Sequence, residues 1–110
     1  MGTLKKENNE SLDMDSKHLS IVKDILKQSI SGKLVWVYGS RIRGTSKKHS
    51  DLDLVVFGLD SKKFSELKEA FEESNLPFRV DLLDWNKIPE SFQNNINKKY
   101  IVLQNEDKKI

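Results

Sequence analysis

The sequence predicts an α/β (α+β) domain in which a small mixed β-sheet carries helices on one face. Two observations lead to this fold class. Segments with helical and strand-like periodicity follow one another in the order helix, strand, strand, helix, strand, helix. The chain has 110 residues, which suffice for one small domain with a modest hydrophobic core.

The composition indicates the cellular compartment of this domain and the classes of partner it can have. Apolar residues make up 36% and charged residues 33% of the chain, and no apolar run approaches the roughly 20 residues of a membrane-spanning helix. The first 16 residues lack the apolar core of a secretory signal, and the chain has no cysteine for disulfides or thiolate metal sites. The net charge of +2 does not indicate nucleic-acid binding. We therefore expect a cytoplasmic protein without a membrane partner.

The N-terminal part combines a polar segment with one helix. Residues 1–16 have few and aperiodic apolar positions, so we expect a flexible tail that folds over only near its end. Asp15 or Ser16 is placed to cap a helix over residues 17–30, and Gly32 follows at the position of a left-handed cap. The helix presents one apolar stripe, formed by Ile21, Val22, Ile25, Leu26 and Ile30.

Two strands follow, separated by a turn and a basic loop. Residues 34–38 are apolar and rich in β-branched and aromatic types, as in a buried strand. Gly39 and Ser40 interrupt this run and indicate a turn that opens a short helix. Residues 51–57 form the second predicted strand.

A helix and a third strand come next. Asp60 or Ser61 is placed to cap a helix that ends near Ser74. Residues 78–85 form the third predicted strand, because apolar side chains alternate along it.

The C-terminal part carries one more helix. Pro89 stands where a helix begins, and the helix continues to about residue 97. Residues 100–103 form either a last strand or a docked tail. Residues 105–110 are polar and expected to fray, so the ordered domain spans residues 17–104.

Two acidic residues stand at the start of the second strand. Asp51 and Asp53 are two positions apart, which on a strand places both carboxylates on one face, about 6.6 Å apart at the backbone. Two acids on the same face of an otherwise apolar strand are costly as packing residues. They suit a hard divalent cation, whose charge offsets their repulsion.

A third acid, Asp81, lies in the middle of the third predicted strand. If that strand neighbours the second, about 4.8 Å away, three carboxylates converge on one place. One or two Mg²⁺ ions would relieve their repulsion. A pair of metals about 3.5–4 Å apart is the usual device for in-line phosphoryl or nucleotidyl transfer.

The turn at Gly39 offers a complementary phosphate site. Glycine lets the backbone come close to a ligand, and amides at a helix N-terminus, with the Ser40 hydroxyl, can hold phosphate oxygens. Arg41 and Arg43 can add charge-assisted hydrogen bonds to the same phosphates.

Together these motifs resemble the nucleotidyltransferase superfamily of DNA polymerase β. Gly39-Ser40, ten intervening residues and Asp51-x-Asp53 are followed by Asp81 on a later strand. The strings GSRIRGTSKKHSDLDL and RVDLLDW are similar in detail to the minimal nucleotidyltransferases, the small partners of helical HEPN proteins in two-gene modules. The resemblance covers residues 17–104.

The resemblance implies a polymerase β-like fold and a role for each motif. By it, Gly39 and Ser40 bind the triphosphate, Asp51 and Asp53 bind both metals, and Asp81 binds the catalytic metal. All three acids are then metal-binding and catalytic. The implied cofactor is Mg²⁺, as two ions, with Mn²⁺ as a substitute. The implied reaction moves a nucleoside monophosphate, AMP being expected, from a nucleoside triphosphate to a hydroxyl.

Two functional hypotheses stay open at this point. In the first, the protein is an enzyme whose acceptor is a HEPN-type partner protein, which would make it an antitoxin. In the second, it is a catalytically silent subunit that binds nucleotide and metal and acts on a helical partner by contact. The three acids favour the enzyme. Trp85, Phe92 and Tyr100 are either core residues or partner contacts; in the second case they form, with residues 101–103, a surface that a partner or a second copy in a homo-oligomer covers.

Overall fold

The computed structural model describes residues 12–47 and 49–107, and its centre is a four-stranded sheet in the order β3-β2-β1-β4. β1 (Val35–Tyr38) pairs antiparallel with β2 (Leu52–Val56) and with β4 (Ile101–Gln104). β2 pairs parallel with β3 (Val80–Asp84). The predicted mixed sheet is thus confirmed, and residues 101–104 are a strand instead of a docked tail.

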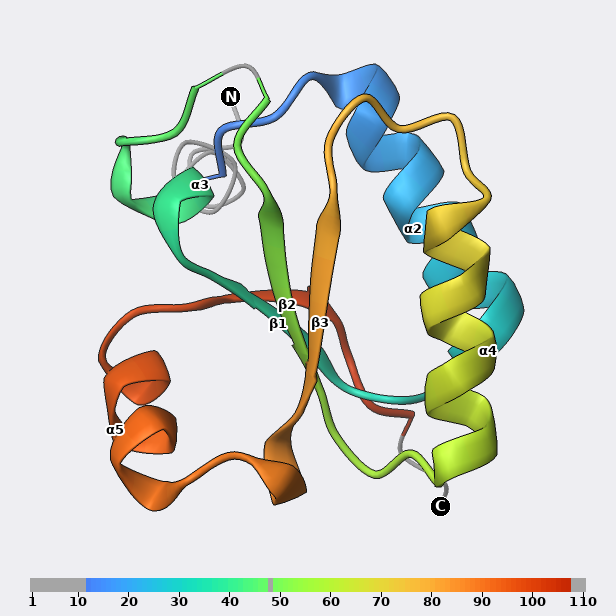
Figure 1. Cartoon of the computed structure of the whole chain (residues 1–110), viewed down its shortest axis with the longest axis vertical. Helices are drawn as coiled ribbons and strands as arrows, with labels where there is room; N and C mark the ends of the chain where they lie inside the picture. Colours follow the sequence, from blue (N-terminus) through green and yellow to red (C-terminus); the bar gives the residue numbers. More distant parts are fainter. Residues whose placement is uncertain (1–11, 48, 108–110) are drawn as a thin grey trace.

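Two long helices cover one face of this sheet (Figure 1). α2 (Ser16–Ile30) is capped by Asp15 and α4 (Ser61–Glu72) by Asp60; each carboxylate accepts a hydrogen bond from a backbone amide of the first turn, at 2.9 and 2.8 Å. Aspartate is favoured there because it satisfies an amide that the helix itself cannot pair. The described residues contain no helix that has both the length and the apolar character to cross a membrane.

The core fills the space between these helices and the sheet. Alternate strand residues point into it, because successive side chains of a strand leave on opposite faces. From the helices, Val22, Leu26 and Leu67 are fully buried. The strands contribute Val35, Val37, Leu52, Leu54 and Val56, each with no exposed surface.

The opposite face of the sheet carries aromatic side chains and the last helix. Trp36 of β1 stacks on Tyr100, with ring centroids 3.7 Å apart, and meets Trp85 edge-on at 5.4 Å. Trp85 begins the 3₁₀ helix η1 (Trp85–Lys87), which leads towards the last helix. Tyr100 remains 38% exposed. No partner chain is present to test the predicted partner surface, which stays a prediction.

α5 (Glu90–Lys98) lies across the sheet from α2 and α4, as Figure 1 shows. Its Phe92 meets the ring of Tyr38 edge-on at 6.0 Å. The helices on one face are therefore α2 and α4, and α5 forms a partial cover on the other. α5 therefore borders one side of the sheet face opposite the core.

The two ends of the domain also make contacts. Of the predicted tail, residues 1–11 lie outside the described part; Leu12 and Met14 pack against the core. At the other end the amide of Asp107 donates a hydrogen bond to the carbonyl of Gly32 at 3.0 Å, and residues 108–110 again lie outside the described part.

Candidate active site

The parallel pairing of β2 and β3 brings two of the predicted acids side by side. Asp53 and Asp81 are direct register partners, so their carboxylates leave the sheet on the same face. That face is opposite to the core, because Leu52, Leu54 and Leu82 on the alternate positions are buried in the core. Asp51 precedes β2 and is exposed.

The other two carboxylates act electrostatically on Asp53. The pKa of Asp53 is raised to about 6; burial is the largest cause, followed by the negative charges of Asp81 and Asp51. The positive charges of Arg43 and Arg41 act in the opposite direction. An ionised Asp53 is therefore destabilised by burial and by like charge, and a bound cation would relieve this destabilisation.

Gly39 allows the backbone of the turn to lie close to the carboxylate of Asp53. Its φ of 91° lies in the left-handed region, where residues with a side chain are strained. A Cβ placed on Gly39 would lie 3.0 Å from Cγ of Asp53 and would overlap Oδ2. Ser40 follows as the first residue of the single-turn helix α3 (Ser40–Arg43). Glycine is thus required at this turn both for its backbone angles and for room beside the acid.

A cavity of about 700 Å³ opens over the acid pair. Asp53 and Asp81 line it from the sheet, Arg43 from α3, and Lys98 and Lys99 from the end of α5. These three basic side chains add positive charge to a cavity that also contains two acids, which suits a polyphosphate chain bound through a divalent cation. The two lysines were not identified from the sequence, because only the folded chain brings the end of α5 to the acids.

Tyr38 gives the same cavity an aromatic wall. It is the register partner of Asp53 in β1, and it lines the cavity together with Phe92. Burial and the negative charges of Asp53 and Asp81 raise the pKa of its hydroxyl. Tyr38 therefore stays protonated at neutral pH and can donate a hydrogen bond towards the acids or a ligand.

Arg41, predicted to bind phosphate, has structural contacts instead. It is only 5% exposed. Its Nε and Nη2 donate to the carbonyl of Ser50 at 3.2 and 2.9 Å, and its Nη1 donates to the carbonyl of Asp13 at 2.8 Å. The guanidinium also lies 4.4 Å over the ring of Phe78. These contacts replace the predicted phosphate contact, and only Arg43 remains a candidate of the two.

A divalent metal fits the acid pair by its chemistry. Within residues 12–47 and 49–107 no group of three or more His, Cys, Asp or Glu side chains has the arrangement of a metal site as it stands. The adjacent carboxylates of Asp53 and Asp81, with the charge of Asp51 close enough to raise the pKa of Asp53, are the hard oxygen donors that Mg²⁺ prefers.

Fold and site agree with a nucleotidyltransferase, and the comparison with known families gives the same class. The chain belongs to the polymerase β nucleotidyltransferase family, whose model matches residues 20–109. The resemblance identified from the motifs is thereby confirmed.

One relative is similar over nearly its whole length. A Haemophilus influenzae protein named "Probable protein adenylyltransferase MntA" is 48% identical to this chain over 102 residues, which are 90% of each chain. This similarity agrees with the assignment of the chain to the nucleotidyltransferase family.

Solved structures share the fold. A crystal structure described as the toxin-antitoxin with AMP-PNP has a TM-score of 0.65 at 24% identity and covers 81% of this chain and 74% of that one. A structure of a tri-AMPylated Shewanella oneidensis HEPN toxin in complex with MNT antitoxin has a TM-score of 0.60 at 20% identity, covering 84% and 73%. At these identities the similarity establishes the fold alone.

Proposed function

We propose that this protein is a cytoplasmic, Mg²⁺-dependent adenylyltransferase that moves AMP from ATP to a hydroxyl of a HEPN-type partner protein, and so acts as an antitoxin. The observation that carries the proposal is the register pair Asp53–Asp81 beneath a cavity with three basic side chains. The family supports nucleotidyl transfer, and the names of its relatives support AMP as the transferred group and a HEPN protein as the acceptor.

The three acids form two cation sites in this proposal. Asp51 and Asp53 hold the cation that accompanies the triphosphate, and Asp81 completes the second cation site together with Asp53. When bound, Mg²⁺ polarises the α-phosphate and lowers the pKa of the attacking hydroxyl. Asp81 acts as the general base that accepts the proton of the attacking hydroxyl.

The turn and the basic side chains hold the triphosphate in place. The amides around Gly39 and the Ser40 hydroxyl bind phosphate oxygens, and Arg43, Lys98 and Lys99 neutralise them. The hydroxyl oxygen forms a bond to the α-phosphorus, the bond to the bridging oxygen breaks, and pyrophosphate leaves with that oxygen and its electron pair. No water is consumed, so the product is a phosphodiester on the partner.

The test separates nucleotide binding from transfer. Asp81→Asn keeps the shape and one neutral oxygen but removes the charge. We expect it to bind Mg²⁺-ATP about as well as the wild type and to lose transfer to the partner by at least about 10²-fold. Asp53→Asn should weaken both. Calorimetry gives the affinity, and radiolabel from α-labelled ATP gives the transfer rate.

Asp84→Asn is the matched control. Asp84 lies on the same strand with the opposite parity, and its carboxylate caps η1 by accepting a hydrogen bond from the Asn86 amide at 3.0 Å. Asparagine keeps such a cap, so transfer should remain at the wild-type rate. Wild-type transfer by Asp81→Asn would remove Asp81 from the site. Nucleotide binding without any transfer by the wild type would instead support the silent subunit.

A further inference from the structure

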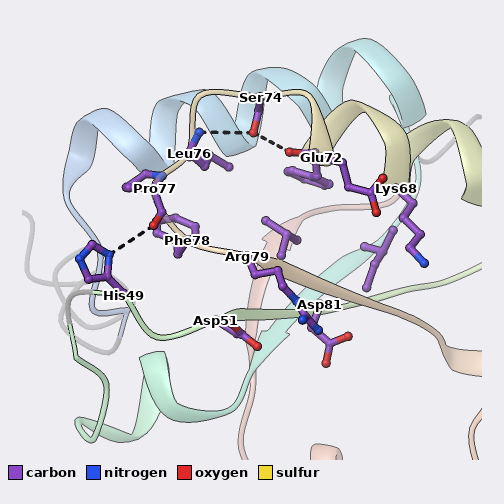
Figure 2. A pocket seen from close by; sticks show the side chains of 13 residues that line it. His49, Asp51, Lys68, Glu72, Ser74, Leu76, Pro77, Phe78, Arg79 and Asp81 are labelled. Carbon is purple, nitrogen blue, oxygen red and sulfur yellow. Dashed lines mark hydrogen bonds between the residues drawn. The ribbon is translucent and has the colours of Figure 1, made fainter.

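Asp81 lies between two cavities, one of which is the basic cavity over the acid pair. A second cavity, of about 750 Å³, lies beside β3 and is lined by Asp51 and Asp81 at one side. Figure 2 shows these two carboxylates on the strand side, with Lys68 and Glu72 of α4 across the cavity. Asp81 lines both cavities. Asp81 is therefore accessible from two directions.

The two cavities differ in chemical character. The first carries three basic side chains and suits a triphosphate. In the second, the three acids Asp51, Asp81 and Glu72 outnumber the basic Lys68 and Arg79, and apolar side chains form part of the lining. The apolar part comes from Phe71, Leu76, Pro77, Phe78, Val80 and Leu82. Such a lining suits an uncharged polypeptide segment better than a phosphate chain.

The reaction itself requires two directions of approach. In an in-line displacement at phosphorus the attacking oxygen and the leaving oxygen lie on opposite sides of the phosphoryl group. With pyrophosphate directed to the basic cavity, the attacking hydroxyl must arrive from the other side of the acids. The second cavity occupies that side.

The edge of the sheet adds a means of holding a polypeptide. β3 is the last strand of the described sheet and pairs only with β2. The outer edge of such a strand presents backbone donors and acceptors along its length. An extended segment can add to it through main-chain hydrogen bonds.

We propose that the cavity beside β3 is the acceptor site, and that it holds an extended, hydroxyl-bearing segment of the partner protein with the hydroxyl at Asp81. The inference rests on the proposed function, since it assigns the second substrate of that reaction. Asp81 forms the boundary between the site of the nucleotide and that of the acceptor.

The experiment uses the absence of cysteine from the chain, which allows one introduced thiol to be labelled alone. Glu72→Cys places the thiol at the cavity; Glu66→Cys places it on the same helix outside the cavity. Both positions are exposed, so both variants should fold. Each is coupled to a benzophenone maleimide, and circular dichroism checks the fold.

The labelled proteins are assayed with ATP and with a HEPN-type partner protein. At position 72 we expect the KM for the partner to rise at least tenfold, the dissociation constant of Mg²⁺-ATP to change less than twofold, and illumination to join the label to the partner. At position 66 we expect none of these effects. The split between the two substrates distinguishes an acceptor site from general damage.

The outcomes separate this inference from the proposed function. If the wild type transfers AMP but the label at position 72 neither raises the partner KM nor crosslinks to the partner, the acceptor site is elsewhere. If the label weakens ATP binding tenfold, the cavity belongs to the nucleotide and the inference is wrong. If the wild type transfers no AMP to the partner, the proposed function fails first and the acceptor site fails with it.

Discussion

Replacing Arg41 by alanine should separate stability from nucleotide binding. Its guanidinium is buried and connects segments far apart in the sequence: it donates to the carbonyls of Asp13 and Ser50 and lies over the ring of Phe78. Ser50 immediately precedes the first acid of the site. Arg43, two positions later on the same helical turn, is exposed and lines the cavity over the acids.

The expected cost follows from these contacts. Without the guanidinium, the carbonyls of Asp13 and Ser50 lose their donors; a fully buried group left unsatisfied costs about 1–3 kcal/mol, and less is expected here because Asp13 is exposed and Ser50 is half-buried. The lost contact with the Phe78 ring adds about 0.5–2 kcal/mol. Because water can reach part of the opened space, we expect Arg41→Ala to lower the free energy of unfolding by about 3–5 kcal/mol. Small domains have only about 5–15 kcal/mol in total.

The assay compares Arg41→Ala with Arg43→Ala in urea unfolding and in calorimetric titration with Mg²⁺-ATP. Arg43→Ala should change the free energy of unfolding by less than about 0.5 kcal/mol, as exposed substitutions do, and should weaken nucleotide binding. Arg41→Ala should also lower Tm by about 4–8 °C for each kcal/mol lost. A loss below about 1 kcal/mol for Arg41→Ala, or an equal loss for both variants, would refute the structural role of this arginine.

Three further predictions concern the turn and the acids. Gly39→Ala should lower the free energy of unfolding by about 1–3 kcal/mol through backbone strain and should weaken nucleotide binding by displacing Asp53. Gly58 is the control, because it also has a positive φ (73°) but no atom lies within 4 Å of an added Cβ. Gly58→Ala should therefore show the strain in urea unfolding and leave nucleotide binding unchanged. The pKa of Asp53 is about 6 in the folded protein against an ordinary 3.8, so between these pH values the folded state binds more protons than the unfolded state. The free energy of unfolding should therefore fall as pH rises from about 3.8 to about 6. Asp53→Asn should flatten that part of the profile of unfolding free energy against pH. Mg²⁺ should raise Tm at pH 7.5 in the wild type and not in Asp53→Asn, and a chelator should weaken ATP binding; equal ATP affinity with Mg²⁺ and with chelator would contradict the metal bridge.

The local pattern of the sequence was sufficient for most elements. Helix caps were predicted at Asp15 or Ser16 and at Asp60 or Ser61, and the structure has Asp15 and Asp60 in these positions. The strands were predicted from alternating or continuous apolar residues, although the structure shortens the third predicted strand to β3 (Val80–Asp84). Strand ends depend on the neighbouring strand, which a local pattern does not specify.

The site was predictable in its acids and incomplete in its surroundings. The spacing of Asp51 and Asp53 determines which face they share, since strand side chains alternate. That Asp81 stands beside Asp53 follows only from the parallel register of β2 and β3. Likewise, the sequence predicted phosphate contacts for both Arg41 and Arg43. The fold buries Arg41 and places Arg43 at the cavity.

The sequence by itself therefore determined the family, the order of the elements and the residues that carry charge into the site. Only the tertiary structure decided which charges meet: the lysines at the end of α5 join the acids, and β3 lies at the edge of the sheet between two cavities. The physical reason is one of range. Periodicity, capping and alternation act between residues a few positions apart, whereas register, burial and cavities arise from packing between segments that the chain separates by tens of residues.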